Sequence, residues 1–168
     1  MILRLLCLAW LCLAALPTTA LAAPPDFTGT WQLDRKASES LDPILKAQGV
    51  SYIKRKVVDG LSVTLEIQHS DSTFDVKVVT SRKTAQQKWV ADNTPRAETR
   101  DGREITSRHA FVEDALVSTA TGIAPSGDAF EMTTTRLISE DGQTMTLKLA
   151  CEVDGKTTNA TRVFRRES

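Results

Sequence analysis

The fold is decided by residues 27–33, FTGTWQL, and by residues 41–58, LDPILKAQGVSYIKRKVV. The first stretch has the pattern of a short β-strand. The second predicts two short helices joined at Gly49, because glycine accepts the left-handed backbone that often ends a helix. Pro43 fits this prediction, since proline is tolerated in the first turn of a helix. The rest of the chain has the pattern of strands, and few folds place a helical pair after one strand and then only strands.

Both predicted helices have an apolar stripe at helical spacing. The stripes are Leu41, Ile44 and Leu45 in the first helix, and Tyr52, Ile53 and Val57 in the second. Ser40 and Ser51 are placed to cap the two helices through their hydroxyl groups. Helices this short are not stable alone, so we expect both to pack on the sheet.

Alternation with a period of two dominates the chain after residue 60 and predicts half-buried strands. Asp-Gly pairs at residues 101–102, 141–142 and 154–155 favour tight hairpin turns between them. We expect about ten strands, near residues 28–35, 61–69, 73–80, 85–91, 95–100, 104–112, 115–122, 129–138, 144–153 and 157–166. Consecutive hairpins favour an all-β, up-and-down antiparallel barrel, because closure removes the exposed sheet edges. The helix-turn-helix between the first two strands would cap one end as a lid.

The N-terminal residues 1–22 have the pattern of a cleaved export signal. Arg4 supplies the positive charge, residues 5–16 form an apolar run, and Ala20-Leu21-Ala22 fits the small-x-small cleavage rule. The run is too short to span a membrane. We therefore expect a mature domain at residues 23–168 that is exported, either to a periplasm or to the extracellular space.

Composition limits the partners of this domain. The chain has 21 basic and 21 acidic residues, which argues against nucleic acid as the main partner. Cys151 is the only cysteine outside the predicted signal, so we expect no internal disulfide. A chain of this size suits one domain with its own core, and we expect it to be a monomer.

Several motifs resemble the intracellular lipid-binding proteins, the fatty-acid and retinoid-binding group of the calycin superfamily. Residues 27–31 are similar to that family's opening Phe-x-Gly-x-Trp, and residues 41–58 are similar to its helix-turn-helix lid. Residues 161–164, TRVF, resemble its terminal Thr-Arg-x-Tyr, and residues 133–136, TTTR, resemble the strand with its second buried arginine. Lipocalins share only Gly-x-Trp. The chain resembles an exported member of the family.

The resemblance implies a hydrophobic carboxylate ligand, such as a fatty acid, in an interior cavity. It implies that Arg162 and Arg136 bind the carboxylate, and it places Phe164 where the family has a tyrosine. Trp89 stands where an aromatic residue lines the cavity, and Arg82 where the family has an apolar gate residue. With Leu45 and the stripe of the second helix, which would be the underside of the lid, Arg82 would form the portal.

The residues alone leave other readings open. Most arginines are exposed, and an inward arginine can be structural, so the barrel could be an envelope-structural or interaction protein filled by its own side chains. Inward positions are mixed in size, with Phe164, Trp89 and Met145 beside Thr134, Ala160 and Thr146. The basic run 54–56 could touch an anionic membrane transiently or simply be solvated.

Motifs for catalysis are missing from the sequence. It has no nucleophile elbow, phosphate loop or dinucleotide fingerprint. His69 and His109 are its only histidines and have no metal-ligand spacing. We therefore expect no enzyme, no metal and no cofactor, with haem binding through His109 as a minor alternative.

Overall fold

The computed structural model describes residues 24–100 and 102–167. The predicted export signal lies outside these residues. The strands are β1 (Gly29–Leu33), β2 (Val63–Ser70), β3 (Thr73–Thr80), β4 (Thr84–Val90), β5 (Arg96–Arg100), β6 (Arg103–Val112), β7 (Ala115–Ile123), β8 (Ala129–Ile138), β9 (Thr144–Val153) and β10 (Lys156–Arg166), and the helices are α1 (Asp42–Ala47) and α2 (Tyr52–Gly60). None of the helices in these ranges is long and apolar enough to cross a membrane.

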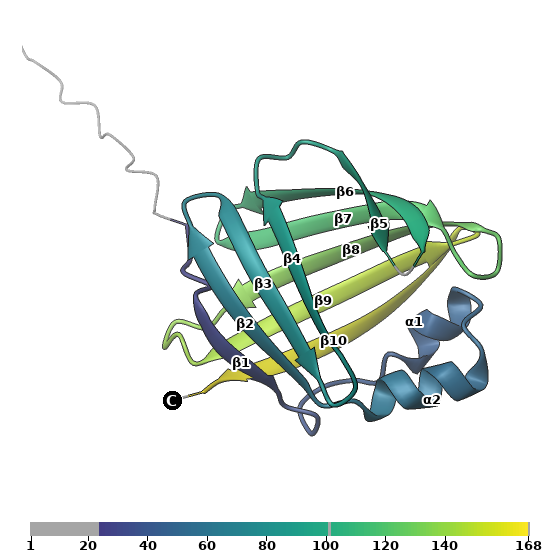
Figure 1. Cartoon of the computed structure of the whole chain (residues 1–168), viewed down its shortest axis with the longest axis horizontal. Coiled ribbons are helices and arrows are strands. Elements are labelled where there is room, and N and C mark those ends of the chain that lie inside the picture. Colours follow the sequence, from purple (N-terminus) through teal and green to yellow (C-terminus); the bar gives the residue numbers. More distant parts are fainter. Residues whose placement is uncertain (1–23, 101, 168) are drawn as a thin grey trace, which may run out of the picture.

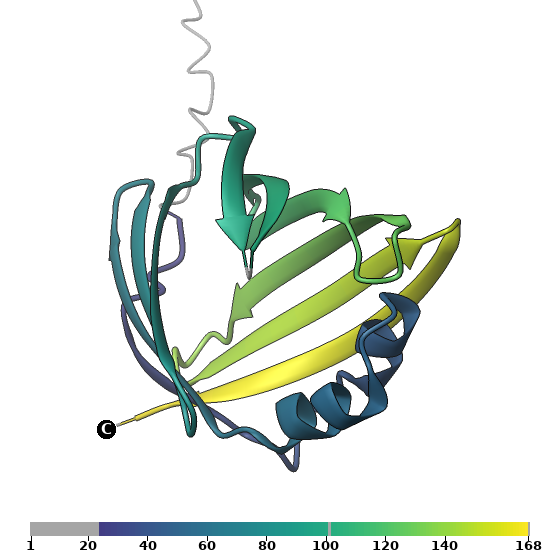
Figure 2. The same cartoon turned by 45° about the vertical axis from the view of Figure 1, so that its right-hand side comes forward.

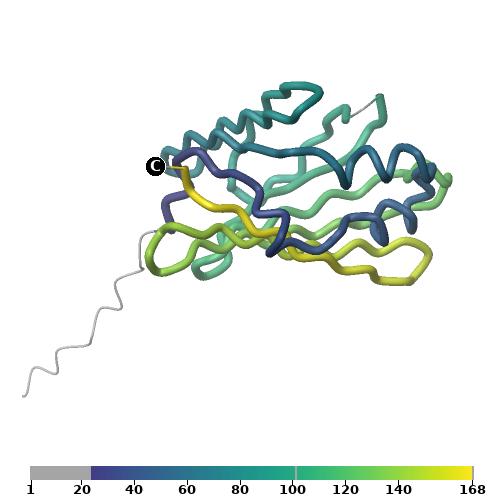
Figure 3. Tube along the Cα trace, turned by 90° about the horizontal axis from the view of Figure 1, so that it is seen from below, coloured from purple at the N-terminus to yellow at the C-terminus, as the bar shows by residue number. Residues whose placement is uncertain are grey.

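All ten strands form one antiparallel sheet in the order β4-β3-β2-β1-β10-β9-β8-β7-β6-β5. The sheet curls around its inner face, and the helices lie at the end of the sheet away from the C-terminus (Figures 1 and 3). The predicted ten-strand barrel with a helical pair after its first strand is thus confirmed. β1 and β10 pair and so join the first strand to the last, from Trp31 opposite Arg166 to Leu33 opposite Phe164.

The expectation that closure removes every sheet edge is wrong, because β4 and β5 do not pair. Figure 2 shows the curled sheet open on this side. The connection between the two strands forms no hairpin bonds. Instead the Ala91 amide donates to the Ser72 carbonyl at 2.7 Å, and the Asn93 amide to the His109 carbonyl at 2.7 Å. These bonds fix the connection to the β2–β3 turn and to β6, so β5 does not run back along β4.

A stack of four rings crosses the gap between β4 and β5. His69, Phe74, Trp89 and His109 follow one another with ring centroids 4.2, 4.2 and 4.3 Å apart and interplanar angles of 12°, 14° and 19°. They stand on β2, β3, β4 and β6, so the last contact joins the edge strand β4 to β6 across the open side of the sheet. Each such pair contributes about 0.5–1.5 kcal/mol beyond the apolar area it buries. Side-chain stacking therefore joins the two sides of the sheet where backbone hydrogen bonds do not.

Apolar side chains on the inner face of the sheet form the main core. Its buried members are Phe27, Trp31, Leu33, Leu65, Ile67, Phe74, Val76, Leu116, Met145, Leu147 and Phe164. A smaller cluster of Ile44, Cys151, Val153 and Ala160 lies between α1 and strands β9 and β10. Of the positions expected to face inward, Thr146 faces outward, because it alternates with the buried Met145 and Leu147 on β9.

The two helices pack differently from each other. α1 buries Ile44 against the smaller cluster, as expected. The expectation is wrong for α2, which buries no residue and leaves Tyr52 63% and Ile53 77% exposed. Polar contacts hold this helix instead. Arg35 donates to the carbonyls of Gly60 and Asp59 at 3.0 and 3.1 Å, and these bonds fix the end of α2.

Both predicted helix caps can be compared with the observed hydrogen bonds. The N-cap residue of α1 is Leu41 and not Ser40, although the Ser40 hydroxyl accepts a hydrogen bond from the Asp42 amide at 3.0 Å. Ser51 is the N-cap residue of α2, but its side chain makes no capping bond. The start of α2 is held instead by Arg55, which bonds to the Val50 carbonyl at 2.8 Å and to the Asp42 carboxylate at 3.0 Å.

Gly49, between the helices, has a φ of 76° and contacts the β7–β8 turn. The Ser126 amide donates to the Gln48 carbonyl at 3.1 Å, which joins the helical pair to this turn. A Cβ atom at residue 49 would lie 2.7 Å from the Ser126 Cβ atom. Glycine is therefore required here by its backbone angle and by the close approach.

We expect Gly49→Ala to lower the free energy of unfolding by about 1–3 kcal/mol, because the positive φ and the contact with Ser126 both become strained. Gly60→Ala is the matched control, since a Cβ atom there would meet nothing within 4 Å. Urea unfolding of both variants measures the difference. Equal stability of the two variants would contradict a close contact between the helical pair and the β7–β8 turn.

Candidate functional site

The main core encloses a cavity of about 150 Å³. Its lining is mostly apolar: Phe27, Leu65, Ile67, Phe74, Val76, Val78, Leu116, Leu147 and Phe164, with Gln87, Trp89 and Arg136 as the residues that carry hydrogen-bond donors. Three of the four residues expected to bind ligand, Arg136, Phe164 and Trp89, thus line one cavity. The fourth, Arg162, does not.

Arg136 is the only charged residue on this cavity. It lies on the inner face of β8, opposite Leu116 on β7 and Leu147 on β9. Its Nη1 donates to the Ser118 Oγ at 2.9 Å, and its Cζ lies 5.8 Å from the centroid of the Trp89 ring. The side chain keeps some accessible surface because it lines the cavity. No carboxylate among the described residues forms an ion pair with it.

The electrostatic cost of this arrangement shows in the pKa of Arg136. Desolvation, and to a smaller extent the charge of Arg100, together lower the pKa to about 10. At neutral pH the guanidinium is still protonated. An arginine that is desolvated and has no acidic partner favours any anion that enters the cavity.

His109 and Ser118 hold the guanidinium of Arg136 in place. The His109 Nδ1 lies 2.8 Å from the Ser118 Oγ, and its Nε2 lies 3.4 Å from the Ser107 Oγ. If the Ser118 hydroxyl accepts a hydrogen bond from Arg136 and donates one to the His109 Nδ1, each donor in this series of hydrogen bonds has one acceptor. His109 is then neutral with its proton on Nε2. Both ring nitrogens have partners, so His109 has no free nitrogen for haem iron.

Burial and the charge of Arg136 lower the pKa of His109 from its ordinary value of 6.5 to about 4. The unfolded chain therefore binds more protons than the folded chain between these two pH values. We expect the free energy of unfolding to fall by roughly 3 kcal/mol as the pH is lowered from about 6.5 to about 4, at ~1.4 kcal/mol per pKa unit.

Urea unfolding at several pH values, with an NMR titration of the imidazole, measures this effect. His109→Gln keeps a polar side chain and removes the titration, so the slope between pH 4 and 6.5 should flatten in that variant. An unchanged slope would show that His109 is not the group responsible.

Arg162 lies on the inner face of β10 but outside the cavity. It is 9% exposed and donates through Nη1 to the Glu39 carbonyl at 3.0 Å. With Arg35 and Asp59 it lines a separate polar hollow of about 140 Å³. Desolvation lowers its pKa, an effect that Asp59 opposes and Arg35 reinforces. Its nearest partners are therefore protein groups rather than cavity space.

The segment that Arg162 contacts, residues 34–39, follows the edge of β10 beyond the end of β1 and is here named the β1–α1 strap. The Glu39 amide donates to the Thr161 carbonyl at 2.8 Å, and the Val163 amide donates to the Ser38 Oγ at 2.9 Å. Arg162 adds a further bond from the inner side. This gives Arg162 a structural role that the sequence motif did not predict.

The residues expected at the portal come together in part. Tyr52, Ile53 and Val57 of α2 and Arg82 of the β3–β4 turn line one open hollow on the surface. Leu45 is partly buried on α1 and does not line it. Because Tyr52 and Ile53 are exposed, the stripe of α2 is not the underside of a closed lid.

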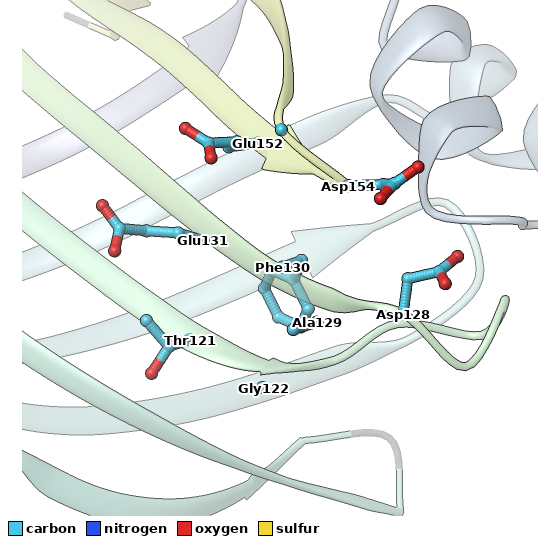
Figure 4. Close-up of a pocket in the computed structure, with 9 residues that line it drawn as sticks. Thr121, Gly122, Asp128, Ala129, Phe130, Glu131, Glu152 and Asp154 are labelled. Atoms are coloured by element: carbon cyan, nitrogen blue, oxygen red, sulfur yellow. The ribbon is translucent and has the colours of Figure 1, made fainter.

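Another hollow lies on the outer surface, where β7 and β9 end and β8 begins. Figure 4 shows its acidic side chains, with Glu131 and Glu152 on neighbouring strands and Asp128 and Asp154 in the turns. Glu131 and Glu152 are directly opposed, which is unfavourable for like charges. In the described ranges no group of acidic, histidine or cysteine side chains is placed to hold a metal ion.

Sequence reasoning missed Gln87, which lines the cavity, and the hydrogen bonds from Arg136 through Ser118 to His109. A signal for them was present in the alternation of each strand. Ser118 and Leu116 share a face of β7, and the register then places His109 opposite Ser118. The pairing of β6 with β7 was needed to show that these side chains meet.

The curled ten-strand sheet with a helical pair after β1 is the fold of small lipid-binding barrels. Solved structures that share it include the REP1-NXSQ fatty acid transporter, with a TM-score of 0.66 and 22% identity, covering 84% of this chain and 96% of that one. The Schistosoma mansoni fatty acid binding protein in complex with arachidonic acid has a TM-score of 0.65 and 21% identity, covering 88% of this chain and 100% of that one.

Proteins of similar sequence are also described as retinoic acid-binding or fatty acid-binding proteins. Cellular retinoic acid-binding protein 1 of Gallus gallus is 33% identical over 85 residues, which are 49% of this chain and 61% of that protein. Fatty acid-binding protein type 3 of Fasciola hepatica is 26% identical over 93 residues, 55% of this chain and 69% of that protein. The chain thus spans about 61% of the length of the retinoic acid-binding relative. No family model matches the chain.

These similarities confirm the resemblance to the fatty-acid and retinoid-binding proteins in both fold and sequence.

Proposed function

We propose that this chain binds and carries a hydrophobic anion, a fatty acid or a similar long-chain carboxylate, without changing it chemically. The observation that carries the proposal is Arg136, a cation with no acidic partner on a mostly apolar cavity. A carboxylate at Arg136 would replace the missing counter-charge. Apolar burial of the tail would contribute about 25 cal/mol per Å².

Known proteins of similar sequence and fold support this proposal. Those named above are described as retinoic acid-binding, fatty acid-binding or fatty acid-transporting proteins. Their descriptions concern binding and transport rather than turnover, which is why we propose a carrier and not an enzyme.

The alternative is an interaction or envelope-structural protein whose barrel is filled by its own side chains. The cavity of about 150 Å³ is smaller than the ~300–1,000 Å³ of typical ligand pockets, and this is the argument for that alternative. In a barrel filled by its own side chains, however, an inward cation without a counter-charge would only cost stability, and Arg136 is such a cation. The carrier is therefore the better supported of the two.

We expect Arg136→Gln to weaken fatty-acid binding by about 1–3 kcal/mol, the range for a lost charge-assisted hydrogen bond. The resemblance assigns the same role to Arg162, whereas its contacts with the β1–α1 strap favour a structural role. Calorimetric titration with hexadecanoate, alongside thermal unfolding, separates the two arginines. Arg162→Gln should lower the melting temperature and leave the affinity almost unchanged.

A large loss of affinity in Arg162→Gln alone would show that Arg162, and not Arg136, binds the carboxylate of the ligand. Unchanged affinity in both variants would contradict the proposal that either arginine binds the carboxylate of the ligand.

We also propose that the protein acts after export and that α2 touches membranes transiently during ligand delivery. Residues 1–22 support export, and α2 presents exposed Tyr52 and Ile53 next to exposed Lys54 and Lys56. Within the basic run Arg55 forms the close ion pair with Asp42, at 3.0 Å, whereas Lys56 lies 4.0 Å from the same carboxylate and keeps 54% of its side chain exposed. An apolar pair flanked by two solvated cations suits an anionic lipid surface.

We expect Lys54→Glu with Lys56→Glu to reduce co-sedimentation with vesicles that contain phosphatidylserine, because a lysine near such a surface contributes about 1 kcal/mol. The control is Lys148→Glu with Lys156→Glu, the same charge change at exposed positions on β9 and β10. Equal losses in the two double variants would show an effect of net charge only. Neutral vesicles should bind all the proteins weakly.

A further inference from the structure

A further hollow, of about 240 Å³ and separate from the cavity at Arg136, opens between the end of α1 and the strands β5 to β8. Its wall is apolar, with Ile105 on β6, Ala120 on β7, and Phe130 and Met132 on β8. These four residues belong to the inner face of the sheet, because the register pairs Met132 with Ala120 and Phe130 with Gly122, which lies opposite Ile105. The interior thus contains a second apolar compartment nearer the helices.

Two arginines line the same hollow, Arg100 at the end of β5 and Arg103 at the start of β6. They are directly opposed across the strand pair, and both share the inner face with Ile105. Arg100 pairs with Glu98 at 3.0 Å, but the side chains are 45% and 36% exposed, so water weakens this ion pair. Arg103 has no ion pair with any described residue. The hollow therefore combines an apolar wall with two available guanidinium groups.

The two compartments follow the same strands. Met132 stands four positions before Arg136 on β8, which is about 13 Å at ~3.3 Å per residue. The pair between these levels is Ser118 on β7 and Thr134 on β8, both small side chains. No large side chain on these two strands separates the levels. An extended hydrocarbon chain that leaves Arg136 along β7 and β8 would bring its other end to Arg100 and Arg103.

We propose that the ligand is anionic at both ends, that is, a long-chain α,ω-dicarboxylic acid. Arg136 receives one carboxylate, and Arg100 with Arg103 receives the other. A ligand with a methyl group at its far end would place that group beside two guanidinium groups, which stay better solvated by water than by an apolar terminus. This inference rests on the proposed function and adds the chemistry of the far end of the ligand.

Calorimetric titration of the purified protein with hexadecanoate and with hexadecanedioate tests the proposal. We expect one dicarboxylate per chain, bound about tenfold more tightly than the monocarboxylate, as one additional charge-assisted hydrogen bond would give. Arg100→Gln with Arg103→Gln should remove this preference and leave the affinity for hexadecanoate unchanged. Arg100→Lys with Arg103→Lys should keep most of the preference, because the charges remain.

Arg108→Gln is the matched control, since Arg108 lies on β6 but is exposed on the outer face. It should leave both affinities unchanged. Circular dichroism of each variant checks that the fold is retained.

Three outcomes would overturn the proposal: equal affinity for the two acids, a preference that survives Arg100→Gln with Arg103→Gln, or two hexadecanoates bound per chain. In each of these the proposed carrier function stands. If neither acid binds, both the carrier function and the dicarboxylate ligand are wrong.

Discussion

The stack of His69, Phe74, Trp89 and His109 is the interaction on which the rest of the interior depends. The sheet curls until its two edge strands face each other without a ladder of hydrogen bonds. The contact between the Trp89 and His109 rings, 4.3 Å apart, spans this opening. His109 in turn bonds to Ser118, which accepts from Arg136. The residues that join the two sides of the barrel are thus the same residues that position its internal cation.

A guanidinium in a protein interior is costly unless it is paired, hydrogen-bonded or solvated. Around Arg136 the cost is reduced in three partial ways. Ser118 accepts one hydrogen bond, the face of the Trp89 ring lies 5.8 Å from Cζ, and the rest of the group faces the cavity. The neutral state of His109 avoids a second cation beside it. These contacts hold the guanidinium without neutralising it, so the counter-charge must come from whatever occupies the cavity.

Much of this fold could be predicted from sequence because each local signal was strong. The Asp-Gly pair at residues 141–142 and the alternation after it placed β9 at the observed residues, Thr144–Val153. The unpaired edges of β4 and β5 could not be predicted, because the amides of Ala91 and Asn93 bond to carbonyls distant in sequence. The exposure of Tyr52 and Ile53 was missed for a similar reason. Helical spacing shows that a stripe exists, but α2 is held by bonds from Arg35 and Arg55, and Tyr52 and Ile53 of its stripe stay exposed.

The two arginines of the sequence motifs, Arg136 and Arg162, show what the sequence could predict about a side chain and what it could not. Both are register partners of Leu147, Arg136 from β8 and Arg162 from β10, so they stand at one level of the inner face. The family resemblance, and not the alternation of the strands, implied that face for each of them. It could not fix where a long side chain ends, because that depends on which acceptors lie within reach. For Arg162 the acceptor is the Glu39 carbonyl of the β1–α1 strap, and for Arg136 it is a single hydroxyl beside open space. The same residue type at the same level therefore fastens a loop in one case and leaves a charge available to a ligand in the other.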